Sequence, residues 1–109
     1  MRNSLVGLIF FSLVAAIVGF GLGEAKADAR RGRVFAEQWC SECHAVAPND
    51  AAGDPAAPDF PEIAEEPSAT AYALRVFLRT PHVTMPNFIL VPDDIEDIIS
   101  YILSLRRRP

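Results

Sequence analysis

The chemically distinctive residues of this 109-residue sequence are two cysteines and a histidine that stand close together. Two residues separate Cys40 from Cys43, and His44 follows at once, which gives the pattern C-x-x-C-H. Each thiol can add to one vinyl group of haem as a thioether, and residues i, i+3 and i+4 share a face of a helical turn. The imidazole of His44 can then ligate the iron from that face. The pattern therefore predicts covalent attachment of haem c.

Two cysteines at this spacing have three other common roles in proteins: a redox pair, a zinc site and a structural disulfide. A thioredoxin-like redox pair has the same C-x-x-C spacing, but it belongs in a βαβ unit, and no segment here has the pattern of a strand. A structural zinc ion needs four ligands, and beyond residue 27 the usual ligands are only Cys40, Cys43, His44 and His82. A disulfide would leave His44 without a role. The sequence favours haem, and zinc is the next alternative.

The N-terminal segment has the order of charge and hydrophobicity that is typical of a secretory signal peptide. Arg2 is the one charge in residues 1–23, an apolar run follows, and the A-K-A of residues 25–27 supplies a cleavage site. We therefore predict a signal peptide over residues 1–27. A retained membrane anchor is the alternative, because 18 uncharged residues precede Gly23 and a spanning helix needs about 20.

Both alternatives carry residues 28–109 across the membrane. We expect the protein in the periplasm, or on the periplasmic face of the inner membrane if the anchor is retained. Residues 28–109 contain 8 basic and 13 acidic side chains, so their net charge is −5. Such a domain is a poor match for nucleic acid, which binds dense lysine and arginine. A domain this small also buries a marginal core and often needs an internal support such as a cofactor.

Hydrophobic spacing and end signals predict three main helices. The first is expected over residues 29–39, directly before the cysteine motif. The second is expected over residues 71–79, with Ser68 or Thr70 as its N-cap. The last begins at Pro92, because proline fits the first position of a helix.

Two proline-rich segments separate these helices. Residues 45–67 contain five prolines, and residues 81–91 contain Pro81 and Pro86. Both segments are predicted to be loops. A loop as long as the first is unusual in a compact domain unless it is functional or wraps something. We therefore predict an all-α domain of three main helices separated by two long loops, with too little aliphatic core to explain the loops.

The chain resembles small bacterial class I c-type cytochromes over residues 28–109. The features that carry the resemblance are Gly32, the motif Cys40–His44, Pro58-Asp59-Phe60, Pro81-His82-Val83-Thr84-Met85-Pro86, and Ile98 with Tyr101 in the last helix. The resemblance implies a cytochrome c-like fold, with three main helices and two long loops around one covalent haem and its iron.

The resemblance also implies a distal ligand for the iron. In the family this ligand is a methionine of the second loop, and the corresponding residue here is Met85. It is the one methionine after residue 27, and prolines on both sides stiffen its loop. His82, three residues earlier, is the alternative ligand.

Two further roles follow from the resemblance. The carbonyl of Pro58 is expected to accept a hydrogen bond from His44, which would fix the imidazole tautomer and raise its basicity. Gly32 is expected to let the first and last helices cross closely, with Ile98 and Tyr101 as its partners.

An iron with both axial positions filled exchanges electrons with little rearrangement and does not readily bind substrate. We therefore predict a one-electron carrier and not an enzyme. The expected partners are redox proteins of the periplasm or inner membrane, such as a dehydrogenase or an oxidase, and the membrane itself only if residues 1–27 are retained. The alternatives are a haem-bearing subunit of a larger redox enzyme, and a haem-based sensor or peroxidase in which Met85 leaves the iron.

Overall fold

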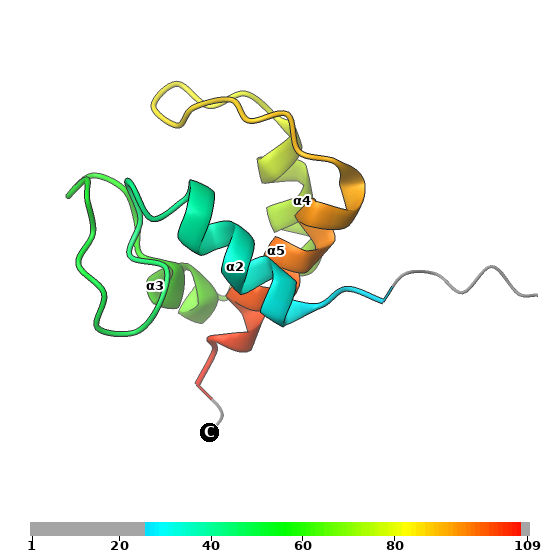
Figure 1. Ribbon diagram of the computed structural model, residues 1–109, viewed down its shortest axis with the longest axis horizontal. Coiled ribbons are helices and arrows are strands. Elements are labelled where there is room, and N and C mark those ends of the chain that lie inside the picture. Colours follow the sequence, from blue (N-terminus) through cyan, green and yellow to red (C-terminus); the bar gives the residue numbers. More distant parts are fainter. Residues whose placement is uncertain (1–25, 108–109) are drawn as a thin grey trace, which may run out of the picture.

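The computed structural model describes residues 26–107, and this part of the chain is all-α (Figure 1). Its helices are α2 (Ala29–Trp39), α3 (Phe60–Glu65), α4 (Ala71–Arg79) and α5 (Pro92–Ser104), and the described residues contain no strand. The predicted fold class and the three expected helices are therefore confirmed. The predicted signal peptide lies almost entirely outside the described residues. Within residues 26–107, no helix is long and apolar enough to cross a membrane.

Short side chains fix where two of the helices begin. The carboxylate of Asp28 accepts a hydrogen bond from the backbone N–H of Arg30 at 2.8 Å and caps α2. The hydroxyl of Thr70 accepts one from the N–H of Ala73 at 3.1 Å and caps α4. Each cap satisfies an N–H group that has no partner inside its helix. Of the two predicted candidates, Thr70 and not Ser68 is therefore the N-cap of α4.

The first long loop contains a helix that the sequence interpretation missed. We predicted a loop over residues 45–67, but α3 occupies part of it. Pro61 lies in the first turn of α3, where a proline lacks only an N–H that would have no helical partner. Phe60 and Ala64 are buried, and α3 contacts α5. Tertiary packing therefore stabilises a helix of six residues that is too short to form alone.

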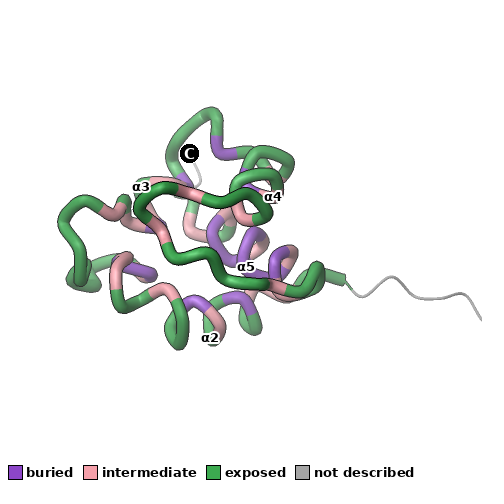
Figure 2. Tube along the Cα trace, turned by 90° about the horizontal axis from the view of Figure 1, so that it is seen from above, coloured by how far each residue is buried: buried purple, intermediate pink, exposed green. Residues whose placement is uncertain are grey.

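The hydrophobic core forms around α5 where α2 crosses it. Figure 2 shows buried positions gathered on these two helices and exposed stretches along the loops. The buried apolar residues of the core are Ala36, Val46, Phe60, Ala64, Ala69, Leu74, Ile95, Ile98, Ile99, Tyr101 and Ile102. A Cβ added to Gly32 would lie 1.9 Å from the carbonyl oxygen of Asp97 and 2.9 Å from Cβ of Tyr101. Only glycine fits this crossing, which confirms the close approach expected at Gly32 and its contact with Tyr101; the other neighbour is Asp97 and not the expected Ile98.

A buried carboxylate lies at the same crossing. Asp97 of α5 is 3% exposed. Its oxygens accept a hydrogen bond from the backbone N–H of Asp28 at 2.6 Å and form an ion pair with Arg31 at 2.9 Å. A buried charge persists only with partners of this kind, because an unpaired one is strongly destabilising. The contacts hold the start of α2 against α5, and α2 leads directly into the cysteine motif.

Candidate haem site

The cysteine motif forms one turn at the end of α2. The N–H of Cys40 donates to the carbonyl of Ala36 at 2.8 Å, which continues the helical bonding pattern past Trp39. The carbonyl of Cys40 then accepts from the N–H of Cys43 at 3.2 Å and from the N–H of His44 at 2.9 Å. These i+3 and i+4 bonds are those of a helical turn. They bring the two sulfurs and the imidazole to neighbouring positions.

Both cysteines are free thiols and half-buried. Burial raises the pKa of the Cys40 thiol to about 11, since the thiolate loses hydration there. The thiol is therefore protonated at neutral pH. No disulfide joins the pair, so both sulfurs are available for thioether bonds.

One hydrogen bond defines the state of His44. Its Nδ1 lies 2.7 Å from the carbonyl oxygen of Pro58, which is the contact that the resemblance implied. A carbonyl oxygen only accepts, so Nδ1 carries the proton and donates it. In the neutral ring with this tautomer, Nε2 has the free lone pair that a metal ligand requires. The ring of Phe60 lies 5.5 Å away between centroids and helps to fix the plane of the imidazole.

The first long loop also closes against the backbone of the motif. The N–H of Asp54 donates to the carbonyl of Cys43 at 3.0 Å. At Gly53 the approach is so close that an added Cβ would lie 1.8 Å from the carbonyl oxygen of Glu42. The sequence analysis placed Gly53 only within the loop predicted over residues 45–67. Gly53 is the one glycine in that proline-rich segment, but the sequence does not show that it lies against Glu42.

A buried tyrosine ties the segment after the motif to α5. The hydroxyl of Tyr101 donates to the carbonyl of Val46 at 2.8 Å, and both residues are buried. Burial raises the pKa of Tyr101 above its ordinary value, which keeps the hydroxyl in its donating form. The motif is therefore held from three sides: by α2, by the first loop and by α5.

The second long loop carries the two candidate distal ligands. Met85 is half-buried. The ring of His82 is engaged with Phe77 of α4, with 3.5 Å between centroids. This tilted contact, with 37° between the ring planes, holds His82 against α4.

Large apolar side chains stand exposed on α2, on α4 and along the second loop. They are Val34 and Trp39 on α2, Tyr72, Val76 and Phe77 on α4, and Val83, Phe88, Ile89 and Val91 on the second loop or at its end. Such a concentration on three elements of a small domain indicates a surface that binds something apolar. A porphyrin ring is a large flat apolar group, so these residues fit it.

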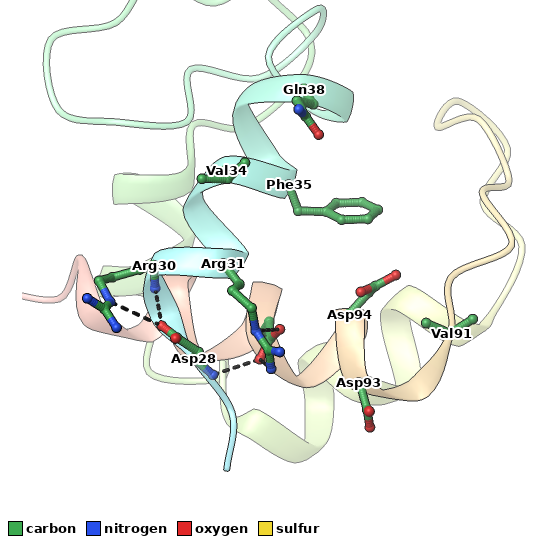
Figure 3. A pocket seen from close by; sticks show the side chains of 10 residues that line it. Asp28, Arg30, Arg31, Val34, Phe35, Gln38, Val91, Asp93 and Asp94 are labelled. Atoms are coloured by element: carbon green, nitrogen blue, oxygen red, sulfur yellow. Dashed lines mark hydrogen bonds and ion pairs between the residues drawn. The ribbon is translucent and has the colours of Figure 1, made fainter. Parts of the chain in front are cut away.

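A separate cavity of about 640 Å³ lies between α2 and the start of α5 (Figure 3). Its lining residues are Asp28, Arg30, Arg31, Val34, Phe35, Gln38, Val91, Asp93, Asp94 and Asp97. None of Cys40, Cys43, His44, Pro58 and Met85 is among them. The zinc alternative gains no support either, because residues 26–107 contain no group of three or more His, Cys, Asp or Glu side chains able to hold a metal ion.

An all-α domain with a C-x-x-C-H turn and a histidine oriented through Nδ1 has the features of a c-type cytochrome. A family model described as "Cytochrome C oxidase, cbb3-type, subunit III" matches residues 27–102. The chain therefore belongs to this cytochrome c family, whose members bind haem c covalently with its iron.

One curated relative supports the same assignment. The chain is 37% identical over 94 residues to a protein named cytochrome c-552 from Bradyrhizobium diazoefficiens. The alignment covers 86% of this chain and 90% of the relative. No solved structure matches the chain. The family and the relative together identify the chain as a small c-type cytochrome, a class of proteins that transfer electrons.

Proposed function

We propose that the chain is an exported one-electron carrier with His/Met ligation of its haem iron. Cys40 and Cys43 would hold the haem c through thioether bonds, His44 would ligate the iron through Nε2, and Met85 would ligate it on the other face. The observation that carries the proposal is the 2.7 Å hydrogen bond from His44 Nδ1 to the Pro58 carbonyl. With Nδ1 engaged in this bond, Nε2 is the ring nitrogen that remains for a metal, as ligation by His44 requires.

Bound haem c supplies an iron that alternates between the ferric and ferrous states. The residues of the chain decide what that iron can do. Two axial ligands leave no open position for a substrate, which favours electron transfer over catalysis. A methionine ligand and an apolar surround both favour the reduced state and raise the potential. The exposed apolar residues of α4 and the second loop supply such a surround.

The proposed location is the periplasm, after export directed by residues 1–27. Partners in the periplasm or inner membrane would be redox proteins such as a dehydrogenase or an oxidase. The net charge of −5 on residues 28–109 favours partners with a basic docking surface. Raising the salt concentration should then slow association.

A second candidate function is a haem-bearing subunit of a larger redox enzyme. It is favoured by the description of the matching family, which names a subunit of an oxidase. Native mass spectrometry of protein isolated from its source distinguishes the two functions. A free carrier appears as a monomer with one haem, whereas a subunit appears in a stable complex. The same spectrum reports whether residues 1–27 have been removed.

The axial ligands are tested by paired substitutions. Coordination of a thioether to ferric iron gives a weak near-infrared absorption band, and a two-histidine site lacks it. Met85→Ala should abolish this band, open the ferrous iron to carbon monoxide and lower the reduction potential. His82→Ala is the matched control from the same loop and should leave all three nearly unchanged.

The opposite pattern would make His82 the distal ligand and would leave electron transfer in place, because a two-histidine iron is also six-coordinate. Rapid binding of carbon monoxide to the unmutated protein would be a different result. It would show an open iron position and replace the carrier with the sensor or peroxidase alternative.

A further inference from the structure

The second long loop is held by two ring contacts, one on each side of Met85. On the N-terminal side, the ring of His82 lies against Phe77 of α4 with 3.5 Å between centroids. On the C-terminal side, Phe88 meets Trp39 of α2 edge to face, with 6.3 Å between centroids and 68° between ring planes. Met85 lies three residues from each contact. The segment that carries the sulfur is thus tied to α4 at one end and to α2 at the other.

The contact between Trp39 and Phe88 joins the loop to the helix that presents the motif. Trp39 is the last residue of α2 and directly precedes Cys40. Phe35, one turn earlier, supports the indole with its ring 6.2 Å away. Among the described residues, no backbone hydrogen bond joins residues 81–91 to α2. Since edge-to-face rings attract each other, this aromatic contact ties the loop to α2.

We propose that Trp39 and Phe88 are positioning residues that keep the sulfur of Met85 on the haem iron. The inference rests on the proposed ligation by Met85. A neutral thioether is a weak ligand, so its bond depends on how firmly the loop is held. Trp39 directly precedes the turn that attaches the haem. The contact with Phe88 therefore keeps the loop that carries Met85 at a fixed position relative to that turn. Without this tie, the loop samples positions in which the sulfur has left the iron.

The exposure of the two rings makes the proposal testable apart from folding. Trp39 is 54% exposed and Phe88 is 37% exposed, and neither belongs to the buried core. Truncating either ring therefore opens no large core cavity. Asn87, the residue before Phe88 in the same loop, is exposed and provides a control for the loss of a neighbouring side chain.

The experiment compares holoproteins carrying Phe88→Ala, Trp39→Ala, both substitutions together, or Asn87→Ala. The readouts are the near-infrared thioether band, the pH at which this band is lost on alkaline titration, and the rate of carbon monoxide binding to ferrous protein. Each single variant should bind carbon monoxide about 2- to 10-fold faster, as expected for the loss of one aromatic contact. Its band should also disappear at lower pH.

Three comparisons complete the expected result. The double variant should behave like the stronger single variant, because both substitutions remove the same contact. Phe88→Tyr and Trp39→Phe keep an aromatic ring and should retain most of the unmutated behaviour. Asn87→Ala should match the unmutated protein in every readout.

Two results would overturn the proposal while leaving Met85 as ligand. One is an unchanged band and carbon monoxide rate in Phe88→Ala. The other is an effect of Phe88→Ala that Trp39→Ala lacks, or that adds to it fully, since Phe88 would then act without Trp39. Absence of the thioether band from the unmutated holoprotein would remove the Met85 assignment itself, and the positioning proposal with it.

Discussion

Gly53 lies directly against the backbone of Glu42, inside the C-x-x-C-H motif. A Cβ at Gly53 would be 1.8 Å from the Glu42 carbonyl oxygen, and the following residue, Asp54, donates its N–H to Cys43 at 3.0 Å. The first loop thus closes on the motif through backbone atoms. The same loop carries Pro58, whose carbonyl orients His44.

Gly53→Ala should therefore push the first loop away from the motif. Overpacking of this kind costs about 1–3 kcal/mol of unfolding free energy. Thermal melts of the holoprotein should show it as a lower Tm, together with a lower yield of attached haem. Ala52→Ser is the control, because Ala52 is exposed and adjacent. Equal melts for both variants would contradict the close approach.

Tyr101→Phe should destabilise the protein by leaving the Val46 carbonyl buried without its donor. An unsatisfied buried acceptor costs about 1–3 kcal/mol. In a domain of this size, each kcal/mol lowers Tm by about 4–8 °C. Tyr72→Phe makes the same chemical change at a residue that is 73% exposed, and its melt should match that of the unmutated protein. A similar small loss in both variants would mean that the hydroxyl of Tyr101 contributes little.

Cys40→Ala or Cys43→Ala should give little stable holoprotein. The core is small, and the exposed apolar residues of α4 and the second loop lose their cover when haem is not tethered. Haem stain after denaturing electrophoresis measures attachment, and circular dichroism melts measure folding. Glu42→Gln, between the two cysteines, should retain both. A well-folded, haem-free double cysteine variant with a normal melting curve would contradict the requirement for haem.

Glu96 should make the stability of the protein depend on pH in the acid range. The hydrogen bond from Arg75, with its Nη2 2.7 Å from Oε2, lowers the pKa of the Glu96 carboxyl below its ordinary value. The folded state therefore binds this proton less readily than the unfolded state. The pair stabilises the fold above the ordinary carboxyl pKa, and this contribution is lost as the pH falls through the lowered value.

The contribution of this pair is modest, because each side chain is 34% exposed and solvent screens the charges. We expect about 1 kcal/mol or less. Unfolding free energies at about pH 7 and about pH 3 should differ less in Glu96→Gln than in the unmutated protein. Glu66→Gln is the control, since Glu66 is exposed and forms no ion pair with any described residue. A pH dependence that Glu96→Gln leaves intact would assign the acid sensitivity to other groups.

The sequence by itself determined the features that depend on neighbouring residues. The bounds of α2 and α4 agree with the predicted ranges 29–39 and 71–79, because caps, prolines and helical periodicity act within a turn or two. The C-x-x-C-H spacing likewise defined the chemistry of the motif. The order of its residues is already the order of a helical turn.

The resemblance to a known family predicted two further contacts, each between residues that are far apart in the chain. It implied the contact between His44 and Pro58 and the close crossing at Gly32, and both geometries are present. The residues alone did not indicate either pair. The spacing of residues along a chain does not show which distant segments contact each other in the folded domain.

Only the tertiary structure decided the contacts between segments that are far apart in the chain. In the sequence Asp97 is one more acidic residue of a helix, yet in the structure it is buried and paired with Arg31, which lies 66 residues earlier in the chain. Helix α3 forms in a segment that was predicted to be a loop. It forms because Phe60 and Ala64 are buried when α3 packs on α5. The ring contact of Trp39 with Phe88 is of the same kind. Such contacts depend on the packing of the whole domain, because each buried group is stabilised by partners that only the folded chain brings to it.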